Sequence, residues 1–171
     1  MSSRAGETFD PTRAATEVLA LADAPVPEAG PTTGEGDPAT GEWTATTGAG
    51  FRIVPLWEGE GLTGLYDTAW SDATDTGVQH LAVLTKTLET HWGPHHVIQL
   101  HGPLLRWQMD QPVEPLFAAL FSQDLYGDLH VWGPLPSGRW LATTVGHSDG
   151  DAPLVMAALV TTQPITQPEG P

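Results

Sequence analysis

The sequence predicts an α+β fold: a mostly antiparallel sheet of about five to six strands, with two or three helices on one face and a disordered leader in front. Two pairs of short, alternating apolar segments, each pair joined by a glycine-rich turn, are typical of β-hairpins. Between them, apolar residues recur every three or four positions, which is typical of a helix with one buried face. The 171-residue chain has the size of one domain and contains no cysteine, which excludes disulfides and thiolate chemistry.

Residues 1–50 are predicted to be a disordered leader that contains one short helix. Asp10 followed by Pro11 is a typical helix start, and the apolar residues that follow share one face of a helix over residues 11–22. Residues 24–50 of the leader are mainly Pro, Gly, Thr and acidic residues, with Trp43 as the one large apolar side chain of that stretch. Such a composition buries too little apolar surface to offset the entropy lost on ordering, so a flexible linker is expected.

A single domain is predicted over residues 51–162, and its first half is a hairpin followed by the strongest helix of the chain. Residues 51–57 and 62–70 are expected to form two strands around the turn Glu58-Gly59-Glu60-Gly61. The helix is expected over residues 75–92, where apolar side chains recur at helical spacing until Gly93-Pro94 ends it.

The second half of the predicted domain again alternates between strands and helices, and residues 163–171 are expected to fray. The expected elements are a strand over 96–101, an extended segment over 104–109, a helix from Glu114-Pro115 to 121, a hairpin of 128–132 with 139–145, and a last helix over 152–161.

The chain is strongly acidic, with a formal net charge of −15 from 21 acidic and six basic residues. The bases are dispersed, so the chain lacks the Lys/Arg cluster that binds a nucleic acid backbone or an anionic membrane. A basic protein partner is expected instead, with the acids of two turns as candidate binding residues: Glu58 with Glu60, and Asp149 with Asp151. Abundant Ala, Gly, Pro and Thr beside a single Lys is also typical of high-GC bacteria, in which acidity is common and needs no partner.

Neither a membrane span nor a secretory signal is expected. No apolar run approaches the roughly 20 residues of a membrane helix, and residues 1–9 lack the apolar core of a signal peptide. A cytoplasmic location is therefore the default expectation.

The segment Gly146-His147-Ser148-Asp149-Gly150 has the G-x-S-x-G form of a hydrolase nucleophile elbow. In that fold a His follows the nucleophile along the chain, and no His follows Ser148. His147 or His130 would serve only in an unrelated architecture. The favoured interpretation is a tight turn whose polar side chains cap a following helix, and a small hydrolase using Ser148 stays as the alternative.

Histidines 91, 95, 96 and 101 are a candidate metal site. In an extended segment His95 and His96 point to opposite faces, and His95 lies about 20 Å from His101. Only His91 with His95 or His96 remains as a chelating pair, and it would need a third ligand from elsewhere. His91 is also well placed to interact with the C-terminal dipole of the helix, so no metal or other cofactor is expected, and a metal-dependent enzyme stays as an alternative.

Six of the seven tryptophans fall in the predicted domain, and most are expected to pack in its core. Trp132 and Trp140 flank the loop of the second hairpin, where they would pack across it. Because exposed Trp side chains are enriched at protein interfaces, these two are also candidate binding residues.

Three segments share features with known sequences: the helix end Trp92-Gly93-Pro94, the hairpin from Val131 to Leu141, and the segment from Gly146 to Leu154. Together they resemble small uncharacterised α+β proteins of high-GC bacteria, some of which are similar to immunity proteins of toxin systems. The resemblance covers about residues 70–160 and implies a binding role without catalysis, in which an acidic protein captures a basic toxin. We therefore expect a non-catalytic protein-binding module. The enzyme described above and a structural component of a larger assembly, with the leader helix docked on a neighbour, are the alternatives.

Overall fold

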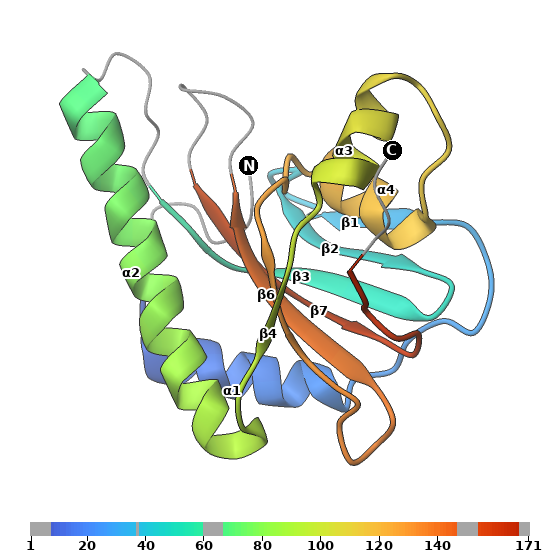
Figure 1. The fold of residues 1–171 in the computed structure, drawn as a ribbon, viewed down its shortest axis with the longest axis horizontal. Helices are drawn as coiled ribbons and strands as arrows, with labels where there is room; N and C mark the ends of the chain where they lie inside the picture. The colour runs from blue at the N-terminus through green and yellow to red at the C-terminus, as the bar shows by residue number, and fades with distance from the viewer. Residues whose placement is uncertain (1–7, 37, 60–66, 147–153, 168–171) are drawn as a thin grey trace.

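A computed structural model describes residues 8–36, 38–59, 67–146 and 154–167, which form seven strands and four helices (Figure 1). The strands make one sheet in the order β1-β2-β3-β7-β6-β5-β4, and every pairing is antiparallel. The elements are α1 (Pro11–Ala22), β1 (Thr33–Gly36), β2 (Trp43–Gly48), β3 (Phe51–Glu58), α2 (Asp67–Trp92), β4 (His96–Ile98), α3 (His101–Gln108), α4 (Pro115–Ser122), β5 (Leu129–Trp132), β6 (Trp140–Gly146) and β7 (Val155–Thr161). The predicted α+β class with an antiparallel sheet is confirmed, although the sheet has more strands than the five to six expected.

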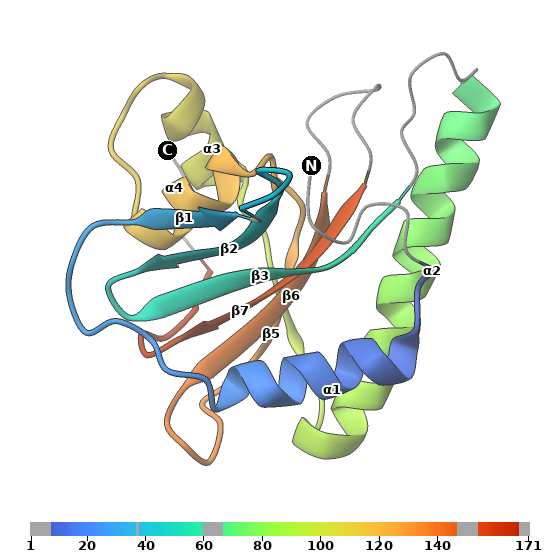
Figure 2. The same ribbon diagram turned by 180° about the vertical axis from the view of Figure 1, so that it is seen from behind.

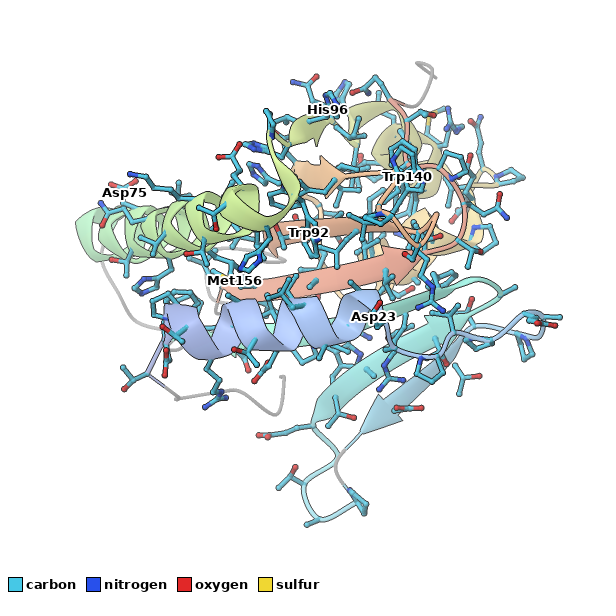
Figure 3. All side chains as sticks on the ribbon, turned by 90° about the horizontal axis from the view of Figure 1, so that it is seen from below. Asp23, Asp75, Trp92, His96, Trp140 and Met156 are labelled. Carbon is cyan, nitrogen blue, oxygen red and sulfur yellow. The ribbon has the colours of Figure 1, made fainter. Side chains whose placement is uncertain are left out.

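The helices lie on both faces of the sheet, and not on one face as predicted. Helices α1 and α2 cover one face and α3 and α4 the other (Figures 1 and 2). Each pair of helices encloses a separate hydrophobic core, so the protein has three layers. Trp92 and Met156 lie between α2 and the strands in the first core (Figure 3). Phe121 and Leu159 are buried in the second.

Helix α1 has the bounds predicted from the sequence and packs on the first core. The Asp10 carboxylate accepts hydrogen bonds from the amides of Thr12 and Arg13, at 3.0 and 3.1 Å, and Pro11 occupies the first helical position. Val18 is fully buried. The helix is thus an integral part of the domain.

The expected flexible linker after α1 is a wrong prediction for the described residues, because this stretch supplies β1 and β2. Strand β2 pairs with β3 and buries Ala45 and Thr46, while Trp43 donates a hydrogen bond from Nε1 to Thr46 Oγ1 at 2.8 Å. The apolar content is low, as the sequence indicated, but the edge of β3 satisfies the backbone groups of β2. Composition alone does not reveal that edge. Residues 1–7 lie outside the described part of the chain.

Helix α2 begins earlier than predicted, because residues 67–70 are helical and do not form the second strand of a hairpin. Residues 60–66 lie outside the described ranges. Leu84 and Leu88 are fully buried, as the apolar spacing predicted, and the left-handed backbone of Gly93 (φ 81°) follows the last helical residue.

Residues 104–108 of the segment expected to be extended belong to helix α3, and the strand before it ends at Ile98. The Gly-Pro pair at 102–103 indicated a turn. It lies instead in the first turn of α3, where proline is tolerated because the amides of that turn have no intrahelical acceptor. Helix α4 and the hairpin of β5 with β6 confirm the predictions for those segments.

The expected last helix over residues 152–161 is also wrong, since residues 155–161 form the central strand β7. Residues 156–161 are buried in succession, because β7 lies between β3 and β6 and has a hydrophobic core on each face. A short continuous apolar run fits a two-sided buried strand as well as a buried helix, so periodicity did not distinguish them.

The segment after β7 was expected to fray, but up to residue 167 it packs on the domain. Ile165 is buried, and Gln167 exchanges two hydrogen bonds with the backbone of Gln99, at 3.0 and 2.9 Å. Residues 168–171 lie outside the described chain. Within the described residues, no helix combines the length and the apolar character that crossing a bilayer requires.

Candidate functional site

An open groove of about 380 Å³ lies between the start of α4, the turn that joins β2 to β3, and the segment after β7. Its base is apolar, since Phe51, Phe117 and Ile165 line it and are themselves almost fully buried. Thr161 and Gln163 add polar groups, and Glu114 is its charged lining residue. The groove therefore joins an apolar base to a single carboxylate.

Backbone pairing brings the distant segments of the groove together. Phe51, the first residue of β3, is paired with Thr161, the last residue of β7. The Thr162 amide then donates a hydrogen bond to the Gly50 carbonyl at 2.9 Å, and this bond holds the segment after β7 against the β2–β3 turn. Ile165 follows in that segment and packs into the second core. The groove is thus built on the central strands of the sheet.

Glu114 occupies the N-cap position of α4, but its side chain makes no capping hydrogen bond. The side chain is exposed, and within the described chain it forms neither a hydrogen bond nor an ion pair. Pro115 supplies the first helical residue, which fixes where α4 begins. The carboxylate therefore stays available at the rim of the groove.

Four acidic residues and no base lie between residues 110 and 128, a segment that we call the acidic segment. All four are exposed: Asp110, Glu114, Asp124 and Asp128. Asp110 and Asp124 follow the ends of α3 and α4 with positive φ angles of 56° and 61°, a conformation that Asp and Asn tolerate better than most residues. Arg106 lies in the last turn of α3, so the ends of these two helices carry more acidic than basic side chains.

Several bases of the chain are bound to its own acceptors. Arg13 forms a 3.1 Å ion pair with Glu17, and Arg52 forms one of 3.8 Å with Glu35. Arg139 donates from Nη1 to the carbonyl oxygens of Ala22, at 3.3 Å, and Ala24. Its guanidinium group therefore holds the C-terminal end of α1 and the residues that follow it. None of these contacts involves a residue of the acidic segment.

A second cluster of side chains lies where β5 meets β4 and the end of α2. The ring centroid of His95 lies 5.0 Å from that of His130 and 5.6 Å from that of Trp132, and its Nδ1 is 3.3 Å from the Glu89 carboxylate. His130 Nδ1 is buried and has no hydrogen-bond partner within the described chain. Burial lowers the pKa of His130 and nearby His95 lowers it further, while Asp128 opposes both.

Because this lowered pKa lies below that of the unfolded chain, stability is expected to depend on pH. Below the ordinary histidine value of 6.5, the unfolded chain binds the proton of His130 more readily than the folded chain. Neutral His130 therefore contributes fully to the free energy of unfolding above pH 6.5, and this contribution is lost as the pH falls towards the lowered pKa of the folded protein. We expect the free energy of unfolding to decrease between about pH 7.5 and about pH 5.5, and to decrease less in His130→Gln. Urea unfolding at several pH values measures this.

The control for this prediction is His96→Gln, because His96 is exposed on the neighbouring strand. This variant is expected to keep the pH dependence of the parent protein. An equally steep pH dependence in His130→Gln would contradict the assignment to His130.

The two predicted tryptophan sites do not form a common surface. Trp132 is buried in the first core and donates from Nε1 to the Gly93 carbonyl at 2.9 Å. Trp140 is half-buried on the opposite face, where it covers Gly133. Trp132 is paired with Leu141, so the neighbouring Trp140 points to the other face of the sheet. The two tryptophans therefore do not pack against each other, contrary to the prediction.

Of the four acidic residues predicted to bind a partner, the structure describes only Glu58. Glu58 is 1% exposed at the end of β3, so its side chain is not at the surface that a partner would contact. Glu60, Asp149 and Asp151 lie outside the described residues, as do His147 and Ser148. The hydrolase alternative thus falls on a segment that the structure does not describe.

The histidines do not group as the metal hypothesis required. His91 is exposed in the last turn of α2, as expected, whereas His95 contacts His130. Across the described chain, no three His, Asp or Glu side chains are arranged to hold a metal ion. The His95–His130 contact was missed because it depends on the register of β4 with β5, in which Val97 is paired with His130.

Sequence reasoning also missed the groove. It identified Glu114-Pro115 as a helix start, but no local pattern indicated that the segment after β7 would return to α4. Comparison with known proteins adds nothing: no protein-family model matches the chain, and neither a curated protein nor a solved structure matches it significantly.

Proposed function

We propose that the protein is a non-catalytic binding module that captures a basic protein partner through its acidic segment. The observation that carries this proposal is the run of four exposed acids between residues 110 and 128, without a base among them. Complementary charge speeds the encounter of two proteins and selects between partners. The resemblance to immunity proteins would make the partner a basic toxin.

The ends of α4 suit such a role because this helix is anchored in the second core. Helix α4 buries Phe117, Leu120 and Phe121 in the second core, so its ends hold a defined position. In addition, Tyr126 donates its hydroxyl hydrogen to Asp124 at 3.1 Å. Acids that are already positioned lose less conformational entropy when a partner binds.

The proposal is tested by affinity capture from the native host with the full-length protein. A basic partner is expected to be retained at physiological salt and released at about 1 M salt, where the screening length falls to about 3 Å. A triple variant, Asp110→Asn with Asp124→Asn and Asp128→Asn, is expected to lose the partner. Asn preserves the side-chain shape and tolerates the positive φ angles of Asp110 and Asp124.

The matched control neutralises three exposed acids outside the acidic segment: Asp23→Asn, Glu28→Gln and Asp75→Asn. It removes the same charge, so any effect of net charge alone appears in both variants. The proposal is wrong if no basic partner is retained, or if the control loses the partner as fully as the acidic-segment variant.

A further inference from the structure

The groove beside α4 has the dimensions and chemistry to accept side chains. Its volume of about 380 Å³ falls at the lower end of the range for ligand sites, roughly 300 to 1,000 Å³. The groove is partly open to solvent, so a side chain that protrudes from a partner could enter it. Leu116 and Pro164 extend its apolar lining.

The charge at the rim favours a cation. The N-terminus of a helix carries the equivalent of about half a positive charge, which alone would attract an anion. The Glu114 carboxylate lies at that N-terminus with a full negative charge, so the sum is negative.

We propose that this groove binds a lysine or arginine side chain of the basic partner together with an adjoining apolar side chain. The cationic group pairs with the Glu114 carboxylate, and the apolar group covers Phe117 and Ile165. The inference rests on the proposed function and specifies which part of the partner the module recognises.

The test uses hexylammonium as a probe, because it joins one ammonium group to an apolar chain. Titration of the ¹⁵N-labelled full-length protein is expected to give saturable amide shifts at groove residues such as Phe117, Thr161 and Gln163. Neutral 1-hexanol is expected to shift the same amides with lower affinity. Glu114→Gln should weaken hexylammonium binding about threefold to fivefold, the size expected of one exposed ion pair, and leave hexanol binding unchanged.

The control variant is Asp110→Asn, which removes one charge of the acidic segment from a residue that does not line the groove. It should change the affinity for hexylammonium by less than Glu114→Gln does. Amide shifts spread evenly over exposed acids, or an unchanged affinity in Glu114→Gln, would overturn the inference.

The two proposals fail in different ways. If the acidic-segment variant loses a basic partner but the groove does not bind hexylammonium, the inference is overturned and the proposed function stands. If no basic partner is captured, the proposed function fails, and the assignment of the groove to a partner's side chains fails with it.

Discussion

Replacing either Leu159 or Met156 with Ala is expected to lower the free energy of unfolding by about 2 to 5 kcal/mol. Both side chains belong to β7 and are at most 1% exposed, but Leu159 packs in the second core and Met156 in the first. Each truncation therefore removes buried apolar surface and leaves a cavity in a different layer. Equilibrium unfolding in urea measures both effects.

The pair of substitutions tests whether β7 is buried on both faces. A strand with one solvated face would be sensitive at only one of the two positions, because they point in opposite directions. Val83→Ala is the control, since Val83 is 49% exposed on α2 and is expected to change stability by less than about 0.5 kcal/mol. A negligible effect of either β7 substitution would contradict the three-layer arrangement.

Replacing Gly127 with Ala is expected to destabilise the protein by about 2 to 3 kcal/mol. A Cβ atom at this position would lie 2.3 Å from the Val145 carbonyl oxygen, far inside van der Waals contact. That oxygen belongs to β6, which is held between β5 and β7, so it has little freedom to retreat. The neighbouring segment is fixed as well, because Thr144 donates from Oγ1 to the Asp128 carbonyl at 2.9 Å.

Gly34→Ala is the matched control for this prediction. Gly34 lies on the edge strand β1, and no atom approaches within 4 Å of a Cβ built there. The change is expected to be close to neutral, because alanine also restricts the unfolded chain. Thermal unfolding of the two variants compares them directly, and equal midpoints would show that residue 127 does not contact β6.

Several elements follow from the sequence because their signals are local. Asp10 with Pro11 specifies the start of α1, and Glu114 with Pro115 specifies the start of α4. The hairpin of β5 with β6 follows from two alternating segments around a Gly- and Pro-rich loop. In each case the deciding interactions connect residues that are close in the chain, such as a cap and the first helical turn.

Tertiary structure alone decided the conformation of segments with ambiguous local signals. The apolar run of β7 suits a buried helix or a buried strand, and its place between β3 and β6 made it a strand. Strands β1 and β2 have the composition of a linker. They form strands because β2 pairs with the edge of β3, and β1 then pairs with β2. The presence of helices on both faces follows from these pairings.

The candidate site depended even more on tertiary structure. The sequence indicated a strong negative charge, but the residues it selected as binding sites include Glu58 and Trp132, both of which are buried. The groove joins Phe51, Glu114 and Ile165, which lie far apart along the chain. The sequence by itself determined the acidity, the α+β class and the locally capped elements. Only the pairing of β3 with β7 brought Phe51 and Thr161 together at the groove, because it unites residues that no local pattern connects.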